Sequence, residues 1–274
     1  MRGEFVDIGG ARLYYYAAGT RGTGDPLILL HGFPASSHLW RDVVPHLPRG
    51  HRMVIADLLG YGRSDRPGEH GVSIAAHAER VLALADTLRI EKFAIAGHDL
   101  GGGIAQHIAV HAPERVSRLA LISSVAFDAW PPRELRMARS ALPFTRKLPS
   151  KPLLNALRRA LKDGYEDLEH GAHSADMYLR PFETPGGREA MVEHIAALDH
   201  EETEALTPRL KEIAVPTTII WGEDDPFIAP EAGVRLKKAI KGSGLFMLPG
   251  VRHYPPETVP ESVAEILGGW LSMA

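Results

Sequence analysis

The residue with the most evident chemistry is Asp99, which stands between two glycines in the run Gly97-His98-Asp99-Leu100-Gly101. A short apolar, β-prone run (92–96) precedes it and an alanine-rich helical pattern (101–112) follows, so the pattern predicts a strand, a tight turn and a helix. The glycines allow the turn to hold Asp99 in a strained conformation, with its side chain above the sheet. A carboxylate in that position is ionised at neutral pH and needs no base before it attacks an sp³ carbon bearing a leaving group.

Two further polar residues follow predicted strands nearer the end of the chain. Asp225 comes after the strand 215–221, in a run that starts Trp221-Gly222, and His253 comes after the strand 245–248. Each of the three residues also has an ordinary alternative: Asp99 as a helix N-cap, Asp225 as a turn residue, and His253 as a surface histidine. Their order along the chain and their places at strand ends favour one shared site.

Composition limits the classes of protein that need to be considered. With 274 residues and 45% apolar content the chain can bury the core of one α/β domain with an insertion. The formal charge of −3, with mixed signs throughout, gives no electrostatic reason to expect nucleic acid or a membrane as partner. There is no cysteine, and no run of about 18 apolar residues was found. We therefore expect a cytoplasmic protein, monomer or homodimer, that acts on a small molecule.

The elements that must position these residues alternate between strand and helix. A hairpin is expected at 5–17. Continuous apolar runs, typical of strands buried on both faces, follow at 26–30 and 52–56. A helix is expected at 74–88 from its one-face apolar spacing, and further strands and helices at 119–123, 231–240 and 260–271. Residues 126–206 contain seven prolines and no convincing strand, and predict a helical insertion between two core segments, 1–125 and 207–274.

These motifs together resemble the α/β-hydrolase fold, in its branch with an aspartate nucleophile. The resemblance rests on the run around Asp99, on His31-Gly32-Phe33-Pro34, on the glycine-rich loop 57–67, and on the two strand ends that carry Asp225 and His253. It covers nearly the whole chain outside 126–206. It implies a mostly parallel, twisted sheet flanked by helices, with a helical cap inserted after the sixth strand.

The resemblance also implies a role for each site residue. Asp99 is the nucleophile, His253 the base, and Asp225 the acid that orients His253. Asp225 is preferred to Asp224 because the family's acid usually lies three residues after this glycine. The backbone N–H groups of Phe33 and Leu100 form the expected oxyanion hole. An alkyl ester on Asp99 would be hydrolysed by a water that His253 deprotonates.

The leaving group separates two candidate reactions. Dehalogenases of this fold usually place Trp or Arg directly after the nucleophile, where this chain has Leu100, and some carry Asn where it has Phe33. Epoxide hydrolases instead use acids, commonly two cap tyrosines, for which Tyr178 and Tyr165 are the candidates. We therefore expect an epoxide hydrolase, although the loop 57–67 and residues 178–182 look somewhat dehalogenase-like. A haloalkane or haloacid dehalogenase is the alternative, and a ligand-binding homologue with little turnover is a third.

The remaining predictions concern the pocket. His31, His98, Trp130 and Phe182 are candidates to line it, and Phe144 is a weaker one. His170 or His173 could replace one of the two phenols. No cofactor is implied. His107 and His111 are the histidine pair at helical i, i+4 spacing, and since the nearest carboxylate is Glu114 we predict an exposed helix face and no metal site.

Overall fold

A computed structural model describes residues 3–20, 22, 24–145, 150–184 and 186–272. An eight-stranded sheet runs through the described part of the chain in the order β1-β2-β4-β3-β5-β6-β7-β8. It is parallel from β4 to β8, and β2 pairs antiparallel with both β1 and β4. The strands are β1 (Glu4–Ile8), β2 (Ala11–Ala18), β3 (Leu27–Leu30), β4 (Met53–Ala56), β5 (Phe93–His98), β6 (Val116–Ile122), β7 (Thr217–Gly222) and β8 (Gly244–Leu248).

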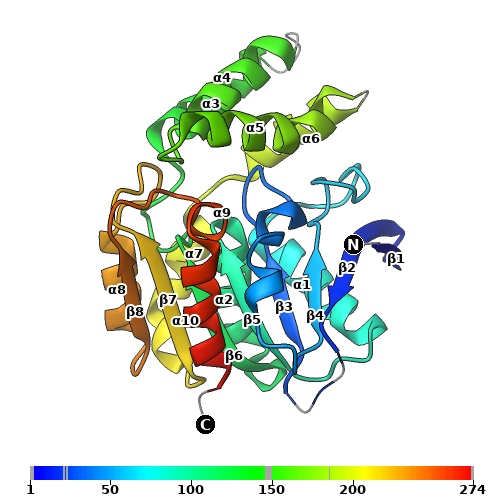
Figure 1. The fold of residues 1–274 in the computed structure, drawn as a ribbon. Helices are drawn as coiled ribbons and strands as arrows, with labels where there is room; N and C mark the ends of the chain where they lie inside the picture. Colours follow the sequence, from blue (N-terminus) through cyan, green and yellow to red (C-terminus); the bar gives the residue numbers. More distant parts are fainter. Residues whose placement is uncertain (1–2, 21, 23, 146–149, 185, 273–274) are drawn as a thin grey trace.

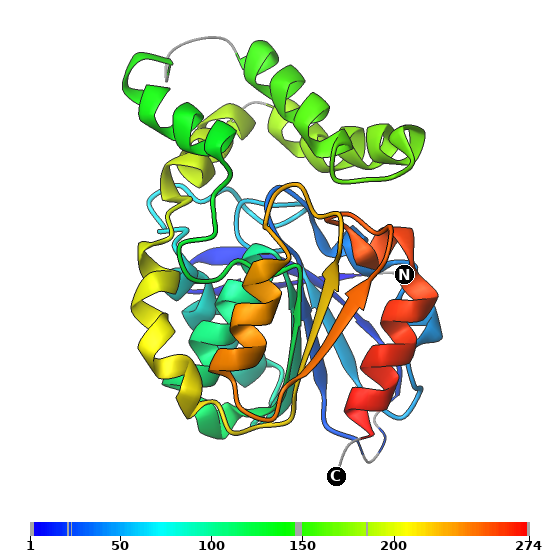
Figure 2. The ribbon, with the colours of Figure 1, turned by 90° about the vertical axis from the view of Figure 1, so that its left-hand side faces the viewer.

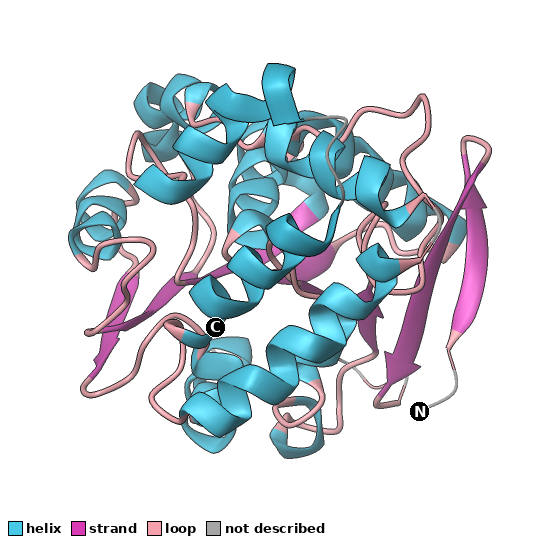
Figure 3. Cartoon of the chain, turned by 90° about the horizontal axis from the view of Figure 1, so that it is seen from above, coloured by secondary structure: helices cyan, strands magenta, loops and turns pink. Residues whose placement is uncertain are grey.

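Helices cover both faces of this sheet (Figure 3). The helices of the core are α1 (Ile74–Thr87), α2 (Leu100–His111), α7 (Glu201–Leu206), α8 (Glu231–Ala239), α9 (Pro255–Thr258) and α10 (Pro260–Leu271). The predicted α/β-hydrolase architecture is therefore confirmed. Between β3 and β4 the chain forms two short 3₁₀ helices, Ser37–Trp40 and Val44–His46, and the proline at position 45 lacks the N–H that a longer helix would need.

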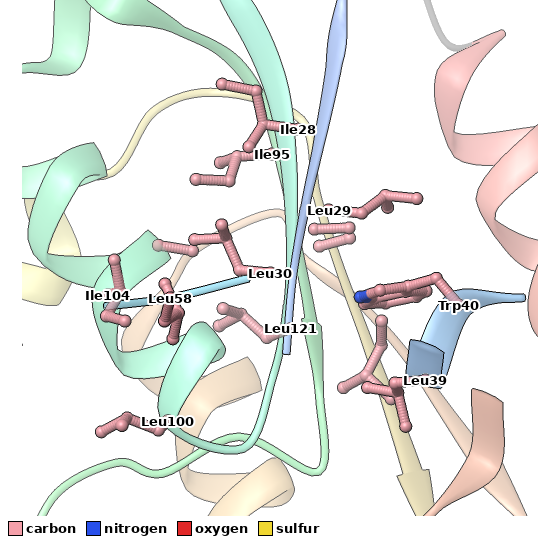
Figure 4. Packing of buried hydrophobic residues seen from close by; sticks show 14 of the residues in the cluster. Ile28, Leu29, Leu30, Leu39, Trp40, Leu58, Ile95, Leu100, Ile104 and Leu121 are labelled. Atoms are coloured by element: carbon pink, nitrogen blue, oxygen red, sulfur yellow. The ribbon is translucent and has the colours of Figure 1, made fainter. Parts of the chain in front are cut away.

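Burial on both faces explains why the central strands read as continuous apolar runs. All four residues of β3 are fully buried. Figure 4 shows Leu29 on the side of Leu39 and Trp40, whereas Ile28 and Leu30 point to the other side, toward Ile104. Strands of this kind cannot alternate between apolar and polar residues, because neither face meets water.

Between β6 and β7 the chain leaves the sheet, and the first four α-helices described there cover it. They are α3 (Arg133–Thr145), α4 (Ser150–Lys162), α5 (Leu168–Leu179) and α6 (Gly187–Ala197), and we call them with their connections the cap. The cap lies above the carboxyl ends of the parallel strands (Figures 1 and 2). Helix α7 also falls within the predicted insertion 126–206, but it packs against α2 of the core. No described helix is long and apolar enough to cross a membrane.

The cap is joined to the core by a buried carboxylate, that of Glu257 on α9. Its side chain is inaccessible to solvent and accepts hydrogen bonds from Arg41 Nη1 of the core, at 3.0 Å, and from the cap. The cap donors are Tyr165 Oη (2.9 Å), Ser174 Oγ (2.6 Å), Tyr178 Oη, and His170 Nε2 (3.4 Å). The backbone N–H of His253 adds a second link, since it donates to the carbonyl of Gly164 in the cap at 3.1 Å.

These donors keep Glu257 ionised in spite of its burial. Burial alone raises the pKa of a carboxyl group, but hydrogen bonds from His170, Ser174 and Tyr178 and the charge of Arg41 more than offset it. The net effect lowers the Glu257 pKa to about 2. A folded-state pKa below the unfolded value stabilises the protein above the unfolded pKa, and this contribution disappears as the pH falls through the folded value.

We predict that Glu257→Ala lowers the free energy of unfolding by about 3 kcal/mol or more, because it leaves the half-buried Arg41 and three cap hydroxyls without their acceptor. Glu257→Gln keeps the shape of the side chain and should lower the free energy of unfolding by less than Glu257→Ala does. It should also remove the part of the wild-type pH dependence that lies between about pH 4.5 and 2. Urea denaturation over this pH range measures both effects. Glu261→Ala, at an exposed position on α10, is the control; equal losses in the alanine variants would contradict the role given to Glu257.

Candidate active site

The turn between β5 and α2 holds Asp99 at φ 50° and ψ −119°. A non-glycine residue at positive φ costs about 1–3 kcal/mol, and such strain persists only where the surroundings impose it. Here the surroundings are close backbone contacts. A Cβ added to Gly97 would lie 2.1 Å from the carbonyl oxygen of Gly101, and one added to Gly101 would lie 2.6 Å from that of His31. Glycine is needed at both positions, and the turn projects the Asp99 side chain above the sheet.

Two backbone N–H groups point at one oxygen of this side chain. The N–H of Phe33 donates to Asp99 Oδ1 at 3.0 Å, and the N–H of Leu100 donates to the same atom. This arrangement can stabilise negative charge that develops on that oxygen. His31 fixes the loop that carries Phe33, since its Nε2 accepts from the Leu58 N–H at 3.0 Å and its Nδ1 lies 2.9 Å from the Gly32 carbonyl. His31 is fully buried and orders this loop. It was expected to line the pocket, but it does not lie in the cavity wall.

The second oxygen of Asp99 faces a histidine. His253 Nε2 lies 3.6 Å from Asp99 Oδ2, and His253 Nδ1 lies 2.8 Å from Asp225 Oδ2. The other oxygen of Asp225 accepts the backbone N–H groups of Phe227 (2.9 Å) and Ile228 (3.0 Å), which orient the carboxylate. Asp225 is buried whereas Asp224 is exposed, so the geometry agrees with the residue predicted from the glycine spacing.

The backbone of His253 is held from both sides. Its N–H donates to Gly164, as described above, and its carbonyl lies 2.8 Å from Nε2 of the buried His98. Burial, together with the charge of His253, lowers the pKa of His98 to about 4, so His98 is neutral at pH 7 and donates through Nε2–H. His98 therefore positions His253 from below and does not line the cavity.

The charges in the site depend on one another. Burial raises the Asp99 pKa, but the adjacent His253 side chain and its positive charge lower the pKa by more, so the carboxylate is ionised. Burial lowers the His253 pKa, and the neighbouring carboxylates of Asp225 and Asp99 reverse this and raise the pKa to about 10. At pH 7 the unreacted site thus holds an Asp99 carboxylate and a His253 imidazolium. Loss of the negative charge on Asp99 would lower the His253 pKa, so the imidazolium would release its proton more readily.

Asp99 and His253 open into a cavity of about 370 Å³ between the core and the cap. Most of its wall is apolar, formed by side chains such as Leu135, Leu157 and Phe227. The ionisable residues that line it besides the catalytic pair are Glu134, Asp163 and Tyr254. In the described part of the chain no lysine or arginine lines this cavity. A neutral, largely apolar molecule matches this wall better than an anion.

Of the other pocket residues predicted from the sequence, Trp130 alone is in the cavity wall. Its indole Nε1 donates to Thr203 Oγ1 at 2.7 Å and is already engaged. Phe182 instead packs edge-on against Tyr61, with ring centroids 6.2 Å apart, and Phe144 is 86% exposed on α3. These side chains lie in or beside the cap, where the sequence pattern does not show which helix face turns inward.

The two tyrosines predicted as cap acids are placed away from the cavity wall. Tyr165 and Tyr178 are both buried and both donate to Glu257 Oε1. This corrects their expected position, since the hydroxyls have a charged acceptor that sequence reasoning missed. His170, the possible substitute, also faces Glu257, and its pKa is raised chiefly by that hydrogen bond. The sequence did carry one signal, because Glu257 and Tyr254 lie within four residues of His253.

Comparisons with known proteins agree with this architecture. A family model described as the alpha/beta hydrolase fold matches residues 25–259. Haloalkane dehalogenase 2 of Mycobacterium tuberculosis is 29% identical over 280 residues, covering 95% of this chain and 92% of the relative. Epoxide hydrolase 4 of Mus musculus is 28% identical over 282 residues, covering 96% and 77%.

A solved structure is similar over almost the whole chain. It is an alpha/beta hydrolase fold protein from Burkholderia ambifaria, with a TM-score of 0.86, 28% identity and 96% of both chains covered. The family match spans most of the sequence. The chain belongs to the α/β hydrolase fold family and is a hydrolase of that family.

Proposed function

We propose that this hydrolase is an epoxide hydrolase that forms an alkyl ester on Asp99 and converts an epoxide and water to a vicinal diol. The observation that carries the proposal is the position of the Asp99 carboxylate, with Oδ1 against two N–H groups and Oδ2 facing His253 at 3.6 Å. A carboxylate nucleophile suits an sp³ carbon, because attack on an acyl group would give a mixed anhydride. This disfavours an ordinary esterase.

In the first step Asp99 Oδ2, the oxygen without backbone donors, attacks a ring carbon. A C–O bond forms to the carboxylate, the ring C–O bond breaks, and the ring oxygen takes up a proton. In the second step hydroxide, formed when His253 deprotonates a water, adds to the ester carbonyl carbon. The carbonyl oxygen is then Oδ1, which already lies against the N–H groups of Phe33 and Leu100. Collapse of the intermediate releases the diol and restores the Asp99 carboxylate.

The charge coupling in the site supplies the base when it is needed. In the unreacted site the two carboxylates hold a proton on His253. Esterification removes the charge of Asp99, so one of these two stabilising charges disappears and the His253 pKa falls. The His253 imidazolium can then give up its proton, which balances protonation of the epoxide oxygen. The neutral imidazole becomes the base for hydrolysis.

The cavity wall favours an epoxide over a halogenated compound as the substrate. A departing halide needs N–H donors, and the positions after the nucleophile and after His31-Gly32 are Leu100 and Phe33, which offer none from their side chains. The indole of Trp130 is already bonded to Thr203. Haloacids fit least well, because Glu134 and Asp163 would repel a carboxylate. The resemblance to haloalkane dehalogenase 2 keeps a haloalkane dehalogenase as the second candidate.

We predict that the purified protein forms diols from neutral, mainly apolar epoxides and releases little halide from haloalkanes or haloacetate. Asp99→Asn should reduce diol formation to about a thousandth or less, since the amide is not a nucleophile. The protein is given a panel of epoxides, haloalkanes and haloacetate; chromatography measures the diol, and a halide assay measures the released halide. Halide release without diol would establish the second candidate, and turnover that survives Asp99→Asn would overturn both.

We also predict that His253→Gln still forms the ester but hydrolyses it too slowly to turn over. A covalent adduct of one substrate per chain should then accumulate on the peptide that contains Asp99, detected by mass spectrometry. His111→Gln, at an exposed position on α2, should turn over normally and accumulate no adduct. If the His253→Gln protein consumes epoxide catalytically, or never becomes alkylated by a substrate of the wild type, the proposed division of roles is wrong.

A further inference from the structure

We infer that Tyr254 is the acid that protonates the ring oxygen during epoxide opening, an inference that rests on the function proposed above. Tyr254 directly follows His253 and lines the cavity together with it and with Asp99. An opening epoxide places its oxygen within this cavity, so the donor must come from the cavity wall. Among the described residues Tyr254 is the wall's one phenol.

The hydroxyl groups of three tyrosines beside the cap differ in their partners. Those of Tyr165 and Tyr178 are bonded to the ionised Glu257. The hydroxyl of Tyr254 has no hydrogen-bond partner in the described part of the chain, although the residue is only 1% exposed. Buried phenol groups usually find a partner, so an unengaged one in a cavity wall is free to donate to a bound ligand. Tyr254 can therefore do what the two cap tyrosines cannot do without leaving Glu257.

The ring of Tyr254 is fixed before any substrate binds. It stacks on Tyr165 with centroids 4.5 Å apart and an interplanar angle of 14°, and it meets the edge of His253 at 4.9 Å. From the cap, Gly164 approaches so closely that a Cβ there would lie 2.6 Å from Tyr254 Cε2. A donor held in this way needs little reorganisation when charge develops on the ring oxygen. The glycine at 164 is what makes room for the ring.

The electrostatic surroundings keep Tyr254 protonated. Burial raises its pKa well above the ordinary value of 10, and the carboxylates of Asp99, Glu257 and Asp225 raise it further. The groups that face it from neighbouring elements are these three carboxylates and the rings of Tyr165, His98 and His253. Before the reaction Tyr254 is thus a protonated phenol that can donate.

The proton transfers balance over the two steps. As Asp99 attacks and the ring C–O bond breaks, the Tyr254 O–H bond breaks and the proton goes to the ring oxygen. The resulting phenolate recovers a proton from the His253 imidazolium, whose hold on that proton weakens once Asp99 is an ester. His253 is then neutral and ready to deprotonate water. Hydrolysis returns the proton to His253 and leaves Asp99 ionised and Tyr254 protonated, as at the start.

The test compares Tyr254→Phe with Tyr165→Phe in the full-length protein, with styrene oxide, or the fastest epoxide of the panel, as substrate. Both variants remove one buried hydroxyl and keep the ring, and circular dichroism and thermal melting check that both fold. Single-turnover experiments separate ester formation from ester hydrolysis. We expect Tyr254→Phe to slow ester formation by about 10²-fold or more and to leave hydrolysis of the preformed ester within a few-fold of wild type. Tyr165→Phe should leave both steps within a few-fold.

Each result has one meaning. Ester formation at the wild-type rate in Tyr254→Phe would overturn the inference while the epoxide hydrolase function stands. Equal slowing in the two variants, or slowing of ester hydrolysis as well, would show a packing role for the ring contacts and would also overturn it. Absence of diol formation in the wild-type protein would instead refute the proposed function itself.

Discussion

The carboxylate of Asp99 is largely shielded from water, with 13% of its side chain exposed, and the rest of this structure depends on how it is kept charged and in place. Its desolvation is offset by two backbone N–H groups on one oxygen and by an imidazolium facing the other. The same groups serve the proposed chemistry, because the N–H pair later meets the tetrahedral oxyanion and the imidazole later meets water. The glycines at 97 and 101, the loop tied down by His31 and the neighbouring strand ends all follow from this requirement.

Another carboxylate, that of Glu257, is buried four residues after His253 and ties the cap to the same segment of chain. Residues 253–257 therefore carry the proposed base, the inferred acid and the link to the cap. The Glu257 carboxylate accepts hydrogen bonds from the cap tyrosines, and the Gly164 carbonyl accepts one from the N–H of His253. The Tyr254 ring stacks on Tyr165. Since these contacts share one short segment, a displacement of the cap would shift His253 and Tyr254 together. The cap is thus a structural part of the active site as well as its cover.

The sequence predicted the core well because the core is encoded locally. Apolar runs at 26–30 and 52–56 are typical of strands covered on both faces, and the glycine spacing around Asp99 indicates a backbone conformation that few other residues tolerate. The order of Asp99, Asp225 and His253 along parallel strands then brings them to one edge of the sheet. Neither the strands nor the turn at Asp99 needed knowledge of distant contacts, and the structure agrees with both.

The sequence predicted the cap much less well because its side chains are placed by distant partners. Tyr178 and Glu257 are 79 positions apart, and nothing near Tyr178 shows that its hydroxyl meets a carboxylate. The sequence pattern around a tyrosine in a cap helix is the same whether its side chain faces the substrate or the core. The two cases differ only in where the hydroxyl finds an acceptor, and in this fold a charged acceptor on α9 lies within reach. The inferred choice of acid therefore depends on tertiary contacts: because Glu257 engages both cap phenols, the phenol of Tyr254, beside His253, is the one that we infer to be left for the substrate.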